Sequence, residues 1–288
     1  MDLLEIRRRV IVALFSDDYL QERLALKGGN ALSLVYNISP RTSFDLDFSL
    51  PDDFSSPEEA CKRMSAALER HFAAQGYAVF DVRLQPKPRL KTEDERPWWG
   101  GYQLTFKLIQ AEKQRALMNR LDKMSIEAHV VGPAQERRVT VDFSKHEYTT
   151  GKIERELDHS VIYVYSPEMI VLEKLRALCQ QMPDYLLTNP RGRAQDFYDI
   201  HRAVTTVSID LSTNENRKLL RHIFRAKQVP LVLLRQMDQQ REVHRPDWQS
   251  VEVSIKGPET LQGYDFYFDF VLDQIRRLEP LGDEEPPL

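Results

Sequence analysis

Two aspartates separated by a single residue, Asp45 and Asp47, are the residues whose spacing most directly indicates chemistry. They lie in segment 43–50, in which apolar and polar residues alternate. Because a strand repeats every two residues, both carboxylates are predicted to point the same way. Two carboxylates this close repel each other unless a cation lies between them, and Mg²⁺ prefers oxygen ligands. The pair therefore predicts a divalent-cation site.

A glycine pair, Gly28 and Gly29, lies just upstream, between a short apolar run and a short amphipathic segment. At a strand-to-helix turn, glycine lets backbone N–H groups approach a phosphate, and the start of the following helix adds partial positive charge. Alone, an Asp-x-Asp pair is typical of a solvated strand face, and a glycine pair is typical of a turn. Together, and in this order, they predict a phosphate-and-magnesium site for nucleotidyl transfer.

These motifs resemble the polymerase-beta-like nucleotidyltransferase superfamily, and in fuller form the AbiEii/AbiGii branch of bacterial toxins. The resemblance implies an NTP substrate and Mg²⁺ or Mn²⁺ bound by Asp45 and Asp47. The family usually has Ser or Thr where this chain has Asn30, whose amide can still donate to a phosphate. The residues that the resemblance assigns to nucleotide binding in this first block are Lys27, Gly28, Gly29, Asn30 and Ser43, and the further matches are Ala31, Leu32 and Arg41.

A third acid, Asp142, lies in the alternating segment 138–144 and leaves the apolar face of its predicted strand. Two-metal phosphoryl-transfer sites often use three carboxylates, one of which helps to activate the attacking hydroxyl. In the superfamily the third acid comes from a later strand, and Asp142 is the best match in position. An exposed strand aspartate without a catalytic role is the alternative interpretation.

Lys174 lies on a helix that Ser166 and Pro167 are predicted to start. It shares a face with apolar residues, which is typical either of a lysine that extends to the rim or of one that reaches a triphosphate. The toxin family carries a lysine motif here, so the resemblance favours a catalytic role.

Segment 191–201 is the second block that resembles the family, and its Asp196 and Asp199 share a helix face. We expect Asp196 to lie across from Lys174, where it orients the lysine, contacts the nucleotide or acts as a general base. The simpler interpretation is an aspartate that stabilises the helix N-terminus. Arg191 and Arg193 are candidates for contacts with triphosphate or RNA phosphates.

The composition bounds the class of protein. The chain has 288 residues, of which 42% are hydrophobic and 29% charged, enough for one or two domains. Neither a signal peptide nor an apolar run long enough to span a membrane is present, and Cys61 and Cys179 form no disulfide framework, so we expect a cytoplasmic protein. The net charge of −4 argues against coating nucleic acid by bulk charge.

The predicted fold is an α/β (α+β) nucleotidyltransferase fold with a mixed sheet flanked by helices. We expect this domain over residues 1–165 and a helical domain over 166–288 that completes the active-site cleft. Helices are predicted at 3–15, 31–36 and 57–74, and strands at 24–26, 43–50, 77–84, 101–108 and 136–143; segment 86–99 is expected to be a loop.

The resemblance implies a toxin of a toxin–antitoxin or abortive-infection system that transfers NMP to RNA. Its first expected acceptor is the tRNA 3′ end, with blocked translation as the result and a cognate antitoxin as partner. Two alternatives remain open, namely nucleotidylation of a protein side chain and a non-catalytic nucleotide-binding partner.

Overall fold

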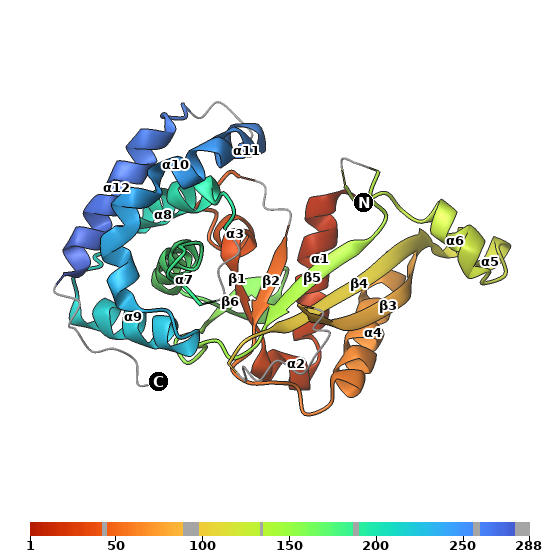
Figure 1. Cartoon of the computed structure of the whole chain (residues 1–288). Coiled ribbons are helices and arrows are strands. Elements are labelled where there is room, and N and C mark those ends of the chain that lie inside the picture. Colours follow the sequence, from red (N-terminus) through yellow and green to blue (C-terminus); the bar gives the residue numbers. More distant parts are fainter. Residues whose placement is uncertain (42–44, 89–97, 133–134, 187–189, 256–259, 280–288) are drawn as a thin grey trace. The chain divides into compact units, whose positions relative to one another are not determined.

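The chain folds into two compact units in a computed structural model that describes residues 1–41, 45–88, 98–132, 135–186, 190–255 and 260–279 (Figure 1). The first unit comprises Met1–Leu26 and Asp45–Val164, and the second comprises Lys27–Phe44 and Tyr165–Leu288. This division differs from the predicted domains in one segment. Lys27–Phe44, which carries the glycine pair, packs with the helical part of the chain.

The first unit is built on a mixed sheet whose described strands follow the order β3-β4-β5-β2-β1-β7-β6. β2 runs parallel to β5 and β1 parallel to β7, whereas β3 with β4, β4 with β5 and β6 with β7 are antiparallel. A mixed sheet with flanking helices confirms the predicted fold class. The strands are β1 (Ala25–Lys27), β2 (Leu46–Ser49), β3 (Tyr77–Lys87), β4 (Gly101–Gln110), β5 (Val139–Ser144), β6 (Ile153–Leu157) and β7 (Ser160–Val164).

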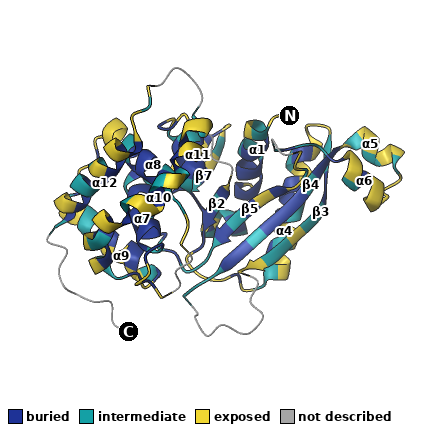
Figure 2. Ribbon diagram, turned by 45° about the horizontal axis from the view of Figure 1, so that its top comes forward, coloured by how far each residue is buried: buried dark blue, intermediate teal, exposed yellow. Residues whose placement is uncertain are grey.

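One face of the sheet is apolar and is covered by α1 (Leu3–Phe15) and α4 (Pro57–Ala73) (Figure 2). Phe48 of β2 stacks on Phe143 of β5 at 5.5 Å between ring centroids and also contacts Phe15 of α1. Phe72 of α4 packs on Phe106 of β4 with the two rings tilted and their centroids 6.1 Å apart. The alternation that buries these rings turns the intervening polar residues toward the opposite face.

The helix boundaries follow the capping residues. Ser56 accepts a hydrogen bond from the Glu59 N–H at the start of α4, and Ser166 accepts one from the Met169 N–H at the start of α7 (Pro167–Cys179). Each serine precedes a proline at the first helical position, where a missing N–H costs nothing. Both helix starts predicted from the sequence are therefore confirmed.

The second unit is helical. α8 (Ala194–Val207) packs on α12 (Tyr264–Leu278) through Phe197 and Phe268, whose rings stack at 5.0 Å. The glycine segment forms the short α3 (Gly28–Asn30) and continues as a π-helical turn over Ala31–Val35. The remaining described helices are α9 (Asn214–Ala226), α10 (Arg241–His244), α11 (Trp248–Ser254) and the 3₁₀ segments Leu231–Gln240 and Arg245–Asp247.

Several elements differ from the expectation. β3 extends to Lys87, so the start of the predicted loop is strand, and residues 89–97 lie outside the described part. β6 and β7 were not predicted, nor were α2 (Asp18–Arg23), α5 (Ala111–Ala116) and α6 (Leu121–Glu127), the last two of which lie at the far end of the β3–β4 hairpin (Figure 1). These elements are short, and a few residues show too little periodicity to distinguish strand, helix and loop.

Cys61 and Cys179 are both free thiols, as expected from their separation in the sequence. Among the described helices, none combines the length and apolar character needed to cross a membrane.

Candidate active site

Asp47 and Asp142 are neighbours on the polar face of the sheet. They are Cα partners in the parallel pair of β2 and β5, with Phe48 opposite Phe143 in the next position. Adjacent strands lie about 4.8 Å apart, and side chains at paired positions point to the same face. The sheet therefore brings together two carboxylates that lie 95 positions apart in the sequence.

The Asp142 carboxylate is held by two donors. Lys87 Nζ lies 2.6 Å from Asp142 Oδ2, and Gln103 Nε2 donates to Asp142 Oδ1 at 3.1 Å. Gln103 is the antiparallel partner of Asp142 in β4, so its position follows directly from the strand register. Neither donor was singled out for this role from the sequence. Only the pairing of β3 with β4 and of β4 with β5 relates them to Asp142.

Asp45 lies immediately before β2 and is exposed. Burial lowers the pKa of Arg7, on α1, to about 10, and the negative charge of Asp45 counteracts part of this effect. Arg7 and Asp45 are thus within electrostatic reach of each other. Ser43, the remaining predicted residue of this segment, lies outside the described residues.

The donor set of the first unit fits a divalent cation chemically, because Asp45, Asp47 and Asp142 supply the carboxylate oxygens that Mg²⁺ and Mn²⁺ prefer. The described residues contain no group of three or more His, Cys, Asp or Glu side chains already gathered as metal ligands. The paired oxygens of Asp142 are occupied by Lys87 and Gln103 instead.

The glycine pair follows β1 directly and belongs to the second unit. Gly28 has a φ of 71°, which explains glycine at this position because side-chain residues rarely adopt that conformation. Gly29 and Asn30 are buried within α3. Lys27, which precedes them, places its Nζ 3.4 Å from Glu173 Oε1 of α7.

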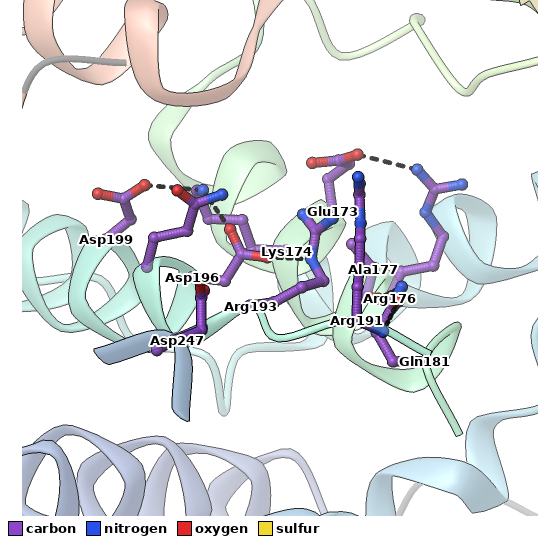
Figure 3. A network of polar contacts seen from close by, with 12 residues as sticks. Glu173, Lys174, Arg176, Ala177, Gln181, Arg191, Arg193, Asp196, Asp199 and Asp247 are labelled. Atoms are coloured by element: carbon purple, nitrogen blue, oxygen red, sulfur yellow. Dashed lines mark hydrogen bonds and ion pairs between the residues drawn. The ribbon is translucent and has the colours of Figure 1, made fainter. Parts of the chain in front are cut away.

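Lys174 forms the centre of a buried ionic network in the second unit (Figure 3). Its Nζ lies 2.7 Å from Asp196 Oδ1 and 2.9 Å from Asp199 Oδ2. The predicted pairing of Lys174 with Asp196 is therefore present, and Asp199 adds a second carboxylate. Burial alone would lower the pKa of Lys174, but the two aspartates outweigh it and raise the pKa.

Two arginines complete the charges around these aspartates. Arg41 Nη2 lies 2.8 Å from Asp199 Oδ2, and Arg193 donates to Asp196 Oδ2. Burial raises the pKa of a carboxyl, yet Arg41 and Lys174 hold the pKa of Asp199 at about 2. The pKa of Asp196 is likewise held below its usual value by Arg193 and Lys174 against the effect of burial. The network is thus ionised throughout the neutral range.

A third carboxylate of the second unit, Glu173, is largely buried and surrounded by positive charge. Arg176 Nη2 lies 3.0 Å from Glu173 Oε1, the same oxygen that Lys27 approaches. Burial would raise the pKa of Glu173, but Lys27 and Arg176 hold it far below its usual value. In the sequence, α7 is an apolar helix with a few charged residues. Neither Glu173 nor Arg176 was predicted from it as a site residue.

Arg191 and Arg193 come just before α8 and occupy different environments. Arg191 is exposed, and its backbone N–H donates to Gln181 Oε1 at 3.3 Å. Arg193 is partly buried against Asp196. Asp247 accepts a hydrogen bond from the Ala194 N–H and so satisfies the start of α8 (Figure 3).

Residues 9–270 match the family model described as Nucleotidyl transferase AbiEii toxin, Type IV TA system. The chain belongs to this family. It is therefore a member of a nucleotidyltransferase toxin family of type IV toxin–antitoxin systems, as the motifs at Asp45–Asp47 and Lys174 indicated. No curated protein matches the chain significantly.

Several solved structures are similar to this AbiEii family member. JHP933 from Helicobacter pylori is 16% identical with a TM-score of 0.46, over 95% of this chain and 89% of that protein. The nucleotidyltransferase toxin MenT4 from Mycobacterium tuberculosis H37Rv is 16% identical with a TM-score of 0.48, over 98% and 85%. An antigenic nucleotidyltransferase-like protein from Paracoccidioides brasiliensis is 14% identical with a TM-score of 0.37, over 86% and 93%.

Proposed function

We propose that this chain transfers a nucleoside monophosphate from an NTP to a hydroxyl group of RNA, with the tRNA 3′ end as the acceptor. Membership of the AbiEii family supports the reaction class. The single observation that carries the proposal is the register of β2 and β5, which makes Asp47 the neighbour of Asp142 on the polar face of the sheet.

In this proposal Asp45 and Asp47 hold Mg²⁺ or Mn²⁺. A bound divalent ion supplies positive charge that neutralises the phosphate oxygens of the nucleotide. Asp47 lies in β2, whose Leu46 and Phe48 are buried, so its backbone is fixed by the core. A carboxylate on a rigid strand keeps its position better than one on a loop.

The reaction itself needs one proton acceptor. The acceptor hydroxyl oxygen forms a bond to the α-phosphorus, and the bond from that phosphorus to the bridging oxygen breaks. Pyrophosphate leaves with the electron pair, and the hydroxyl proton passes to a carboxylate. Asp142 suits this role because it is partly exposed beside Asp47, whereas Asp196 is buried between Lys174 and Arg193.

The residues proposed to bind the nucleotide lie at the end of β1, directly after it, or just before α8. Gly28, Gly29 and Asn30 cradle the triphosphate through backbone N–H groups and the Asn30 amide. Lys27, Arg191 and Arg193 balance its negative charge.

Lys174 is a further cation with a proposed role, and its contacts with Asp196 and Asp199 support electrostatic action from within the network. Of the three roles considered for Asp196, orientation of Lys174 has the direct support of these contacts.

The proposed consequence in a bacterium is blocked translation and growth arrest, in the setting of abortive infection and phage defence. A cognate antitoxin would counteract this effect, as the type IV toxin–antitoxin description of the family implies.

The test is transfer from labelled NTPs with Mg²⁺, using separate tRNA and protein fractions as acceptors. We expect label on tRNA 3′ ends, and loss of at least about 100-fold in Asp47→Asn, because cation stabilisation is worth several kcal/mol. Asp122→Asn, an exposed aspartate of α6, is the matched control. Label on the protein fraction alone would redirect the proposal to a protein acceptor, and full activity of Asp47→Asn would refute the site.

A further inference from the structure

Lys87 is the last residue of β3, and its ammonium group binds one of the proposed site carboxylates. Its Nζ lies 2.6 Å from Asp142 Oδ2. The strand register fixes its backbone, because Lys87 is the Cα partner of Gly101 in β4. Its side chain is 52% exposed, and the Asp142 side chain 21% exposed. The contact therefore joins a backbone held in a strand to a solvated head group.

The position of this ammonium group matters because of the neighbour of Asp142. Asp47 is the Cα partner of Asp142. The ammonium group of Lys87 next to Asp142 therefore lies in the electric field of both carboxylates. A monovalent ammonium there repels an incoming divalent cation and occupies one of the oxygens that the cation would attract. An ion pair this exposed is weak, so it can be exchanged readily.

Gln103 provides the contrasting contact on the same carboxylate. It donates to Asp142 Oδ1 at 3.1 Å. Because the amide group is neutral, it does not repel a cation. Gln103 is the direct strand partner of Asp142, and it is less exposed than Lys87. Gln103 thus orients the carboxylate, whereas Lys87 neutralises it.

We propose that Lys87 is an exchangeable counter-ion of the active site. In the absence of substrate, its ammonium group neutralises Asp142. When a divalent cation and a nucleotide bind, Lys87 leaves Asp142 and pairs with a phosphate oxygen of the nucleotide. Its long, flexible stem and compact charge suit this exchange. The inference rests on the proposed function, since it assumes that Asp47 holds a cation.

The test is binding of Mn²⁺ alone, and then of inorganic triphosphate with Mn²⁺, to the full chain by calorimetry. Lys87→Met should bind Mn²⁺ about twofold to fivefold more tightly and triphosphate more weakly by a similar factor, as the strength of exposed ion pairs suggests. Lys87→Arg keeps the charge and should resemble the wild type in both measurements. Gln103→Leu should not tighten Mn²⁺ binding.

The opposite signs of the two effects separate this proposal from a structural ion pair, whose loss would alter both affinities in the same direction or neither. Unchanged or weaker Mn²⁺ binding by Lys87→Met would overturn it, as would equal tightening by Gln103→Leu. Asp47→Asn separates the two levels of the argument. If this variant binds Mn²⁺ as well as the wild type, the cation site fails. If it loses Mn²⁺ while Lys87→Met changes nothing, only the inference about Lys87 fails.

Discussion

At the scale of single residues, the buried lysine of α7 shows how charge can be part of a core. Lys174 is 5% exposed and contacts Asp196 and Asp199, which Arg193 and Arg41 also bind. Buried charges are tolerated where each has a partner, and removal of one leaves the others uncompensated. The sequence predicted Asp196 as a partner of Lys174, but it gave no indication that Asp199 would be a second one.

We expect Lys174→Met to lower the free energy of unfolding by about 3–5 kcal/mol, because Asp196 and Asp199 lose a shared counter-ion in a buried setting. Urea denaturation followed by circular dichroism measures this change. Lys62→Met, at an exposed position of α4, is the control and should alter stability by less than about 0.5 kcal/mol. Wild-type stability of Lys174→Met would show that the network contributes nothing to the fold.

Because of His244 in α10, we expect the stability of the protein to depend on pH. It is fully buried against Phe197, and neither ring nitrogen has a hydrogen-bond partner among the described residues. Burial lowers its pKa to about 4, against about 6.5 in an unfolded chain. Between these values the unfolded state binds more protons, so the stability that neutral His244 permits is lost as the pH falls from about 6.5 toward 4.

The wild type should therefore lose about 2 kcal/mol more than His244→Phe when the pH is lowered from about 7 to about 4.5. Chemical denaturation at both pH values measures the difference. His159→Gln is the control, because the His159 side chain is 99% exposed and its removal should leave the pH dependence unchanged. Parallel curves for the wild type and His244→Phe would contradict the prediction.

At the scale of elements, the pairing of β4 with β5 sets Gln103 next to Asp142 on the polar face of the sheet. Gly101 begins β4 opposite Ser144, and an added Cβ would lie 1.9 Å from the Phe143 carbonyl oxygen. Only a residue without a side chain permits this close approach of the two strands. The same pairing sets Gln103 against Asp142, so the position of Gly101 bears on the site.

Gly101→Ala should therefore cost about 1–3 kcal/mol of stability, as overpacking does, because backbone must move to admit the methyl group. The displaced strand should also weaken the bond from Gln103 to Asp142. Thermal unfolding measures the first effect, and Mn²⁺ binding measures the second. Gly263→Ala is the matched control, since its added Cβ would meet no atom within 4 Å. Equal stability of the two variants would contradict this account of the strand pairing.

At the scale of the whole molecule, the second unit draws on two separate parts of the chain. The segment Lys27–Phe44 is tied to the later helices by polar contacts within that unit. Arg41 pairs with Asp199, the Tyr36 hydroxyl donates to the Tyr165 carbonyl at 2.7 Å, and Arg202 donates to the Ile38 carbonyl. The glycine pair and the lysine helix are therefore parts of one compact unit, although about 140 residues separate them.

A chain that ends at Val164 should consequently fail to reach the native state, because Lys27–Phe44 would lose these partners and expose its apolar side chains. We expect a low soluble yield and strong binding of a hydrophobic dye. A chain that ends at Glu279 keeps every described residue and should behave as the full chain does. A monomeric, cooperatively unfolding product of the first truncation would show that residues 1–164 are an independent domain.

The sequence alone determined the motifs and the elements with strong local signals. Ser56 and Ser166 predicted their helices because a cap and a following proline act within one turn. The Asp45–Asp47 pair and the Lys174 block indicated the family because their spacing reflects a chemical requirement. The alternation around Phe48 and Phe143 predicted strands, because burial of one face imposes a period of two.

Only the tertiary structure decided which of these residues meet. The strand register placed Asp142 beside Asp47 and gave it Lys87 and Gln103 as partners, and helix packing turned Asp199 toward Arg41 and Lys174. Packing also makes Lys27–Phe44 part of the helical unit, although the sequence predicted it to belong to the sheet unit. Such contacts join residues far apart in the chain, so they depend on the whole core and leave no periodic trace in any one segment.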